Sequence, residues 1–308
     1  MNTTDDLPLA GRVAVVSGAG AGLGRAHART LAAMGASVVI NDLPVPSDAD
    51  PGVTIAEAVA AEIRAVGGAA IAVHASVADA GAGERIVEKA IDAFSRVDIV
   101  VNNAGILRDG PLRKRDRADW EAVIGVHVHG AYELTRAAWP YMLDAGFGRV
   151  VVTSSAAGIY GTANNASYGT AKMGVVGMAR MLAAEAAGTD INVNAIAPLA
   201  LTAMSSSGGD RDRAADVIGD LFQRMPAEQV SQTVGWLCHP DCDVTGRIFA
   251  VGGGRVAEVL VTETRGWVRP GHTWRDVRDN WDSVTDRGEL HVPVHISDEL
   301  QLFMAVLG

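Results

Sequence analysis

Short apolar runs rich in Val and Ile alternate along the chain with longer stretches of helix length, and this alternation constrains the fold more than any other feature. A run that is apolar at every position fits a strand buried on both faces, because helices then cover both sides of the sheet. The apolar runs are 13–16, 37–40, 70–73, 99–101, 149–152, 191–196 and 248–251. The stretches of helix length are 23–34, 55–66, 83–94, 119–143 and 168–187.

The pattern predicts one α/β domain over residues 8–254, with a Rossmann-type, doubly wound parallel sheet of seven strands and right-handed crossovers. Residues 255–308 follow as a C-terminal extension that holds Trp267, Trp274 and Trp281. Because aromatic side chains favour burial, we expect this extension to pack on the domain or on a neighbouring subunit. The small, polar stretch that begins at Ser205 has two interpretations, a mobile lid and a plain surface connection.

Charge and composition exclude several classes of protein. The chain carries 26 basic and 36 acidic residues, a net charge of −10, which argues against a nucleic-acid binder and against a polybasic membrane-surface protein. No run of about 20 apolar residues predicts a membrane span. The first residues lack the pattern of a secretory signal and the last three are not a peroxisomal address, so we expect a cytoplasmic protein.

Two cysteines, Cys238 and Cys242, are too few for a disulfide framework. Their spacing, with His239 between them, could suggest a metal site, but such sites usually have four ligands and the chain has no second cluster. We interpret them as ordinary thiols and expect no metal.

The residues after the first apolar run predict a dinucleotide site. The segment Ser17-Gly18-Ala19-Gly20-Ala21-Gly22-Leu23-Gly24 follows a predicted strand and opens a predicted helix. Glycines permit a tight turn and bring the backbone close to a pyrophosphate, and a helix N-terminus offers free N–H groups and the positive end of the helix dipole. A glycine-rich turn alone is a weak signal, but this one has the expected strand and helix on either side.

Asp42 ends the second predicted strand and favours NAD as the cofactor. A carboxylate at this place can accept both ribose hydroxyls of NAD, whereas the 2′-phosphate of NADP would meet a like charge. No Arg lies in the adjacent Asn41-Asp42-Leu43-Pro44 segment to offset that repulsion. The alternative is that Asp42 only starts the turn before Pro44.

Tyr168 and Lys172 are four residues apart, which puts both side chains on one face of a helix. A Tyr with a pKa near 10 is a weak base, and we expect the neighbouring ammonium to lower that pKa and to create a proton-transfer group. Ser155 precedes Tyr168 and follows a predicted strand, so it should lie at the carboxyl edge of the sheet and donate a hydrogen bond to a substrate oxygen. Ser154 is the competing candidate.

In combination, these residues and Asn102-Asn103-Ala104-Gly105 resemble the short-chain dehydrogenase/reductase family over about residues 8–254. The resemblance implies hydride transfer between a nicotinamide and a carbinol or carbonyl carbon, with Tyr168 as acid/base, Lys172 on the nicotinamide ribose and Ser155 orienting the substrate. The cofactor contacts that it implies are Gly18, Gly22, Leu23, Gly24, Asp42, Ser76, Val77, Asn103, Ala104, Gly105, Tyr168, Lys172, Pro198 and Thr202.

The sequence departs from the family pattern at three places. His127 stands where the family usually has an Asn that helps to hold a proton-relay water. His127 is therefore a fourth candidate catalytic residue, and helix packing is its alternative role. Leu199 replaces the Gly that commonly follows Pro198, and Ser76 replaces an Asp often found near the adenine.

Several segments, among them Val126-His127-Val128-His129-Gly130 and Glu263-Thr264-Arg265-Gly266-Trp267, resemble the dehydrogenase unit of the peroxisomal multifunctional enzymes of type 2. This resemblance implies an NAD-dependent (3R)-3-hydroxyacyl-CoA dehydrogenase with an acyl-CoA substrate, in a homodimer or homotetramer. The alternatives are a 17β-hydroxysteroid dehydrogenase with a steroid-like substrate, a 3-oxoacyl reductase and a catalytically silent NAD-binding module.

Overall fold

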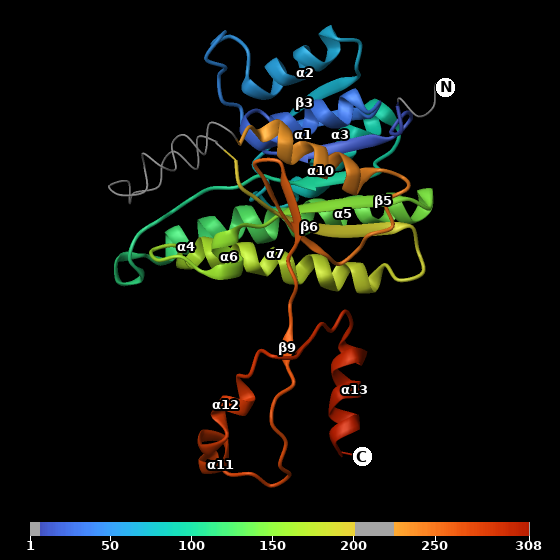
Figure 1. Cartoon of the computed structure of the whole chain (residues 1–308). Helices are drawn as coiled ribbons and strands as arrows, with labels where there is room; N and C mark the ends of the chain where they lie inside the picture. Colours follow the sequence, from blue (N-terminus) through green and yellow to red (C-terminus); the bar gives the residue numbers. More distant parts are fainter. Residues whose placement is uncertain (1–6, 201–224, 308) are drawn as a thin grey trace. The chain divides into compact units, whose positions relative to one another are not determined.

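The computed structural model describes residues 7–200 and 225–307, and the strands of the larger part form one sheet with helices on both faces (Figure 1). The strand order is β3-β2-β1-β4-β5-β6-β7-β8, and β1 to β7 are parallel. The parallel strands are β1 (Val13–Ser17), β2 (Ser37–Asp42), β3 (Ala70–His74), β4 (Ile99–Asn102), β5 (Gly148–Thr153), β6 (Ile191–Pro198) and β7 (Ile248–Gly252). The doubly wound parallel sheet predicted from the apolar runs is therefore confirmed.

One further strand, β8 (Arg255–Glu258), extends the sheet beyond the prediction. It pairs antiparallel with β7, with Gly252 opposite Arg255. The chain divides into two compact units between Glu258 and Val259, so these residues, which the sequence placed in the extension, belong with the sheet. They are mostly exposed, and a strand held by ladder hydrogen bonds rather than by burial has no apolar pattern to predict it.

The helices form two layers, with α1, α2 and α10 on one face of the sheet and α3, α5 and α7 on the other (Figure 1). Their bounds are α1 (Gly22–Ala33), α2 (Ile55–Ala65), α3 (Ala82–Phe94), α4 (Arg117–Ile124), α5 (Gly130–Ala145), α6 (Ala156–Tyr160), α7 (Ala166–Glu185) and α10 (Ala227–Cys238), with a 3-10 turn η1 (Leu112–Lys114) before α4.

The helix expected over 119–143 has an irregularity at its centre. A π-helical turn, η2 (Gly125–His129), joins α4 to α5, and its backbone stays in the right-handed helical region. A π turn inserts one extra residue per turn and re-aims the side chains that it carries, and such turns are frequent at functional sites. It is the turn that carries His127.

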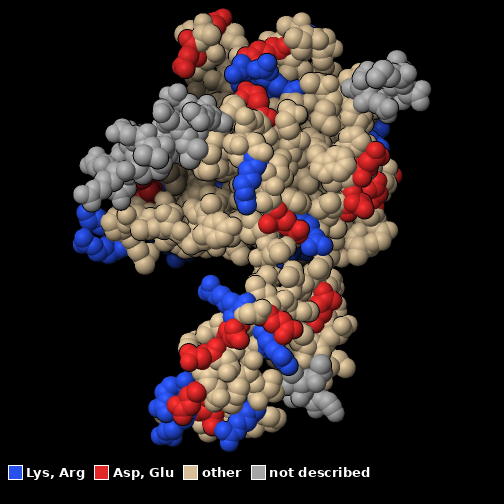
Figure 2. All heavy atoms as spheres, viewed as in Figure 1, with Lys and Arg blue, Asp and Glu red and all other residues tan. Residues whose placement is uncertain are grey.

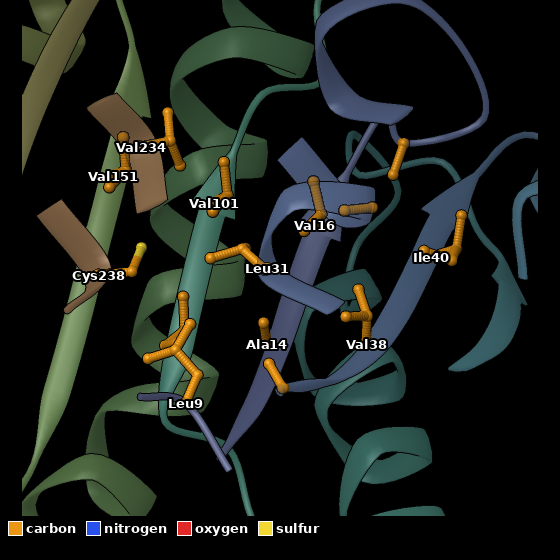
Figure 3. Close-up of a cluster of buried hydrophobic side chains, with 14 of the residues drawn as sticks. Leu9, Ala14, Val16, Leu31, Val38, Ile40, Val101, Val151, Val234 and Cys238 are labelled. Carbon is orange, nitrogen blue, oxygen red and sulfur yellow. The ribbon is translucent and has the colours of Figure 1, made fainter. Parts of the chain in front are cut away.

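The core lies between the sheet and the layer of α1 and α10. Figure 3 shows Val16, Val38 and Val101 from neighbouring strands meeting Leu31 of α1 and Val234 of α10. These side chains are fully buried, and each contributes about 1.5–3 kcal/mol through removal of its apolar surface from water. The packed sheet is the rigid frame on which the loops at its carboxyl edge are fixed.

The second compact unit, Val259–Gly308, has a small sheet and short helices. Its elements are β9 (Glu263–Thr264), α11 (Trp274–Asp279), α12 (Trp281–Val284), β10 (Leu290–His291) and α13 (Ile296–Leu307). β9 and β10 pair antiparallel, and Thr273 and Asp276 form a capping box at the start of α11. Trp274 is 66% exposed, and the guanidinium groups of Arg275 and Arg278 lie over its ring. The packing of this extension on the domain or on another subunit stays a prediction.

Candidate active site

The predicted site residues converge at the carboxyl edge of the parallel strands, where ligands bind in open α/β sheets. A pocket of about 550 Å³ opens there. The predicted residues that line it are Gly18, Gly22, Leu23, Asp42, Ser76, Val77, Asn103, Ala104, Gly105, His127, Ser155, Tyr168, Lys172 and Pro198. Gly24 lies beneath the turn, directly against the carbonyl of Gly18, and Thr202 lies outside the described residues, as does the stretch that begins at Ser205.

The glycine turn forms a cradle without side chains. Gly18 has a φ of +61°, and a Cβ there would lie 2.7 Å from Cα of Ala104. No side chain caps the N-terminus of α1, so its first N–H groups stay available to an anion. The turn is held from behind, because Nδ2 of Asn103 donates to the carbonyls of Ser17 (3.1 Å) and Gly18 (3.0 Å). These features fit the pyrophosphate of a dinucleotide.

Asp42 lies at the end of β2 with its carboxylate fixed by backbone groups. Oδ2 accepts from the N–H of Gly20 at 2.8 Å and Oδ1 accepts from the N–H of Leu43 at 2.8 Å. The side chain therefore organises the turn before Pro44, as the alternative interpretation expects, and it also lines the pocket. Ser76 and Val77 follow β3 and line the same pocket. A carboxylate at this position fits ribose hydroxyls and repels a phosphate.

The structure distinguishes the two serines after β5. The hydroxyl of Ser154 donates to the carbonyl of Lys172 at 2.7 Å and is buried. Ser155 caps α6, and its Oγ accepts from the N–H of Ala157 at 3.2 Å, which leaves the hydroxyl proton to donate. Ser155 is thus the serine able to donate to a substrate oxygen.

Tyr168 and Lys172 lie one turn apart on α7, with Nζ of Lys172 5.6 Å from the centre of the Tyr168 ring. Nζ donates to the carbonyl of Thr153 at 2.6 Å. Burial lowers the pKa of Lys172 to about 7. Burial also raises the pKa of Tyr168, although a hydrogen bond with Ser155 opposes the rise. The net pKa of Tyr168 is therefore raised, not lowered as the four-residue spacing predicted, because desolvation of the phenolate is the larger effect.

His127 is brought to the site by the π turn. Its ring meets the Tyr168 ring edge to face, with 5.4 Å between centres. Its Nε2 lies 2.8 Å from the carbonyl of Ile106 and 3.1 Å from the N–H of the same residue. Burial and the charge of Lys172 lower the pKa of His127 to about 3, so the ring is neutral at pH 7. A Cβ on Gly105 would lie 2.5 Å from the ring, so this glycine is needed for the approach.

A small cavity of about 10 Å³ adjoins His127, Lys172 and Asn102 as well as several apolar side chains, and it has room for about one water molecule. Within the described residues, Nδ1 of His127 and Oδ1 of Asn102 are buried without a hydrogen-bond partner. No sequence pattern assigns a role of its own to Asn102 or to Asn165. Asn165 lines the main pocket, and its Oδ1 lacks a partner among the described residues. Only the position of Asn165 just before α7 could have pointed to it.

The two cysteines lie away from this pocket. Cys238 and Cys242 are free and buried, and burial raises the pKa of Cys238 to about 12. A thiol that stays protonated is a poor metal ligand. In the part of the chain that the structure describes, no group of three or more His, Cys, Asp or Glu side chains could hold a metal ion. Nor does any described helix have the length and apolarity to cross a membrane.

Comparisons with known proteins agree with this geometry. The model of the short chain dehydrogenase family matches residues 12–212. Over 302 residues the chain is 39% identical to peroxisomal multifunctional enzyme type 2 of Mus musculus, which covers 96% of this chain and 40% of that protein. It is 38% identical over 267 residues to a hydroxyacyl-CoA dehydrogenase of Mycobacterium tuberculosis, which covers 84% of this chain and 81% of that protein.

A solved structure is also similar. The full-length peroxisomal multifunctional enzyme type 2 of Drosophila melanogaster matches with a TM-score of 0.80 and 35% identity, over 97% of this chain and 49% of that one. The chain therefore spans less than half the length of these multifunctional enzymes from mouse and fly.

Proposed function

Because the chain belongs to the short-chain dehydrogenase family, we propose that it is an NAD-dependent (3R)-3-hydroxyacyl-CoA dehydrogenase. One observation carries the proposal. Ser155, Tyr168 and Lys172 line the same pocket as an uncapped glycine turn and a fixed carboxylate at Asp42. The substrate class rests on the names of two similar proteins, a multifunctional enzyme of peroxisomes and a hydroxyacyl-CoA dehydrogenase.

The residues of the pocket divide into a cofactor end and a reacting end. The glycine turn and the N-terminus of α1 would hold the pyrophosphate, and Asp42 would accept the ribose hydroxyls. Val77, Asn103, Ala104 and Pro198 would complete the contacts. When bound, the nicotinamide supplies the acceptor for the hydride of the carbinol carbon.

The proton moves through this chain's own groups. Oη of Tyr168 takes the proton of the substrate hydroxyl, and Ser155 donates a hydrogen bond that keeps the substrate oxygen beside Oη. Since burial raises the pKa of Tyr168, the resting phenol is protonated and must first release its proton. The buried ammonium of Lys172 favours the phenolate that results. His127 and the small cavity next to Lys172 offer a route for that proton.

A substrate panel tests the proposal. Purified protein is assayed for NADH formation with (3R)- and (3S)-3-hydroxyacyl-CoA thioesters of several chain lengths, with 17β-hydroxysteroids and with NADP in place of NAD. We expect turnover of the (3R) thioesters with NAD. Turnover of steroids alone would show that the substrate is a steroid and not an acyl-CoA. Activity with NADP only would contradict NAD as the cofactor. NAD binding without any turnover would support the catalytically silent NAD-binding module.

The cytoplasmic location predicted from the sequence stays a prediction. Two similar proteins are named peroxisomal, and they are much longer than this chain. Fluorescence of a fusion protein in its native cell would test the location.

A further inference from the structure

A basic segment lies next to the reacting end of the pocket in a chain whose net charge is −10. Between Leu107 and Arg117 the chain has more basic than acidic residues. The basic residues are Arg108, Arg113, Lys114, Arg115 and Arg117, and the acidic residues are Asp109 and Asp116. Figure 2 shows Lys and Arg side chains gathered at the end of the larger unit where the chain enters α4. We call residues 108–117 the basic segment.

We propose that the basic segment binds the phosphate groups of the coenzyme A carrier while the acyl chain reacts in the pocket. The inference rests on the proposed function, because it assigns a phosphate-bearing substrate to the same site. Three observations support it: the position of the segment, its anchoring and its charge pairing.

The segment leaves the pocket wall directly. Ile106 and Leu107 line the pocket, and Arg108 is the next residue. At full extension the six residues from Leu107 to Arg113 span about 20 Å, so the backbone of Arg113 cannot lie farther than that from Leu107 in the pocket wall. An extended pantetheine arm can bridge a distance of this order.

The base of the segment is fixed on the reacting side of the pocket. The N–H of Gly110 donates to the carbonyl of Asn164 at 2.7 Å, and the neighbouring Asn165 lines the pocket before Tyr168. The guanidinium of Arg115 packs against Gly110, which has a φ of +142°. Arg115 in turn pairs with Asp119 at 2.9 Å. These contacts fix the start of the basic segment beside the site.

Charge pairing leaves two cations for a ligand. Arg108 and Arg115 lie near Asp119, at 3.7 Å and 2.9 Å, and Arg117 pairs with Glu121 at 3.1 Å. Arg113 and Lys114 are exposed on η1 and have no ion pair among the described residues. Two adjacent cations suit a pyrophosphate and a ribose phosphate, which are dianionic or nearly so. Leu112, 71% exposed beside them, offers an apolar contact to a nucleotide base.

The cofactor end of the pocket disfavours a ribose that carries a phosphate. Asp42 lies at the end of β2, where its carboxylate repels a phosphate. The two ends therefore assign two adenine nucleotides to different places, NAD at the acidic end and the CoA carrier at the basic end.

Binding of the free carrier tests the proposal without turnover. Calorimetry measures the dissociation constants of coenzyme A and of 3′-dephospho-coenzyme A for the NADH-saturated protein and for the double variant Arg113→Gln/Lys114→Gln. We expect the dissociation constant of coenzyme A to rise about tenfold in the variant, and to rise with salt only in the wild type. The control Arg29→Gln/Lys89→Gln removes the same charge from exposed positions on α1 and α3 and should bind as the wild type does.

Turnover supplies the second arm. Two substrates with the same acyl group are compared, a 3-hydroxyacyl-CoA and the N-acetylcysteamine thioester, which lacks phosphates. We expect the ratio of their kcat/KM values, CoA thioester over N-acetylcysteamine thioester, to fall about tenfold in the variant and to stay unchanged in the control. Unchanged binding and an unchanged ratio would overturn the inference. So would a loss confined to a thioester carried on an acyl carrier protein, which would indicate an acidic protein partner. Failure of every thioester to react would count against the proposed function, while the binding arm would still decide the phosphate site.

Discussion

Lys172 is a buried amine in a protein whose other charged side chains are mostly at the surface, and this makes it costly to the fold. Its pKa falls to about 7 because burial disfavours the ammonium form. The unfolded chain, with a Lys pKa near 10.5, binds more protons than the folded one between about pH 7 and pH 10.5. The free energy of unfolding should therefore rise with pH across that window, by up to about 1.4 kcal/mol per pH unit from this group.

We predict that Lys172→Met stabilises the protein at pH 7, by about 1–3 kcal/mol, while it removes activity. Met has a similar length and needs no partner for a charge, although it loses the bond to the carbonyl of Thr153. Urea unfolding between pH 6.5 and 9.5 checks this, and the slope with pH should flatten in the variant. A variant less stable than the wild type throughout would show that the bond outweighs the burial cost.

Asp42 determines cofactor choice in the proposed function. We predict that Asp42→Ala lowers the preference for NAD over NADP at least about tenfold in kcat/KM, because the charge that repels the 2′-phosphate is lost. The change also frees the N–H groups of Gly20 and Leu43, so thermal unfolding must show that the fold persists. An unaltered preference in a folded variant would place the selecting acid elsewhere.

At the scale of elements, the π turn η2 joins two helices and points His127 at the site. We predict that His127→Ala lowers kcat about tenfold, because the contact to Ile106 and the polar lining beside Lys172 are lost together. His127→Asn should recover most of the loss, since an amide can also pair with the Ile106 backbone.

The matched control is His129→Asn on the same turn, because His129 is exposed. A loss of thermal stability in His127→Ala with unchanged kcat would show that the ring only packs the helix. Equal loss of kcat in the His129 variant would show that the turn, and not His127, is being disturbed.

The elements that the sequence predicts well are those whose pattern is local. The apolar run at Val13, the glycine turn behind it and the four-residue spacing of Tyr168 and Lys172 each follow from chain geometry over a few residues. The π turn is different, because one inserted residue depends on packing against Gly105 and Tyr168 from distant segments.

Depth of burial is equally non-local. A neighbouring ammonium predicts a lowered pKa for Tyr168, but the surrounding protein desolvates the phenol and raises it. The spacing to Tyr168 favours Ser155 over Ser154, but the physical reason, the bond from Ser154 to the carbonyl of Lys172, needs coordinates.

For the whole molecule, we predict association into a homodimer or homotetramer. The outer face of α7 carries Met173 and Met181, which is 66% exposed, beside the small residues Gly174 and Gly177. Exposed apolar side chains with small neighbours suit the close approach of a helix from another copy. Light scattering should give a mass that is a multiple of 32.0 kDa.

Charges on that face test the assembly. Met173→Glu/Met181→Glu should shift the mass towards the single chain without loss of helical signal, because two carboxylates would be buried at the contact. A wild type that remains a single chain at high concentration would contradict the assembly. If the wild type associates and the double variant associates equally well, the contact between subunits lies on another surface.

The most direct test of the central claim compares the wild type with Tyr168→Phe in a single turnover, with NAD and a (3R)-3-hydroxyacyl-CoA. The ring remains in Phe, so NAD should bind with nearly the same dissociation constant, while the rate of NADH formation should fall by about 10²–10⁴ because the proton acceptor is gone. A Tyr168→Phe protein that forms NADH at the wild-type rate would contradict the assignment of Tyr168 and of the site built around it.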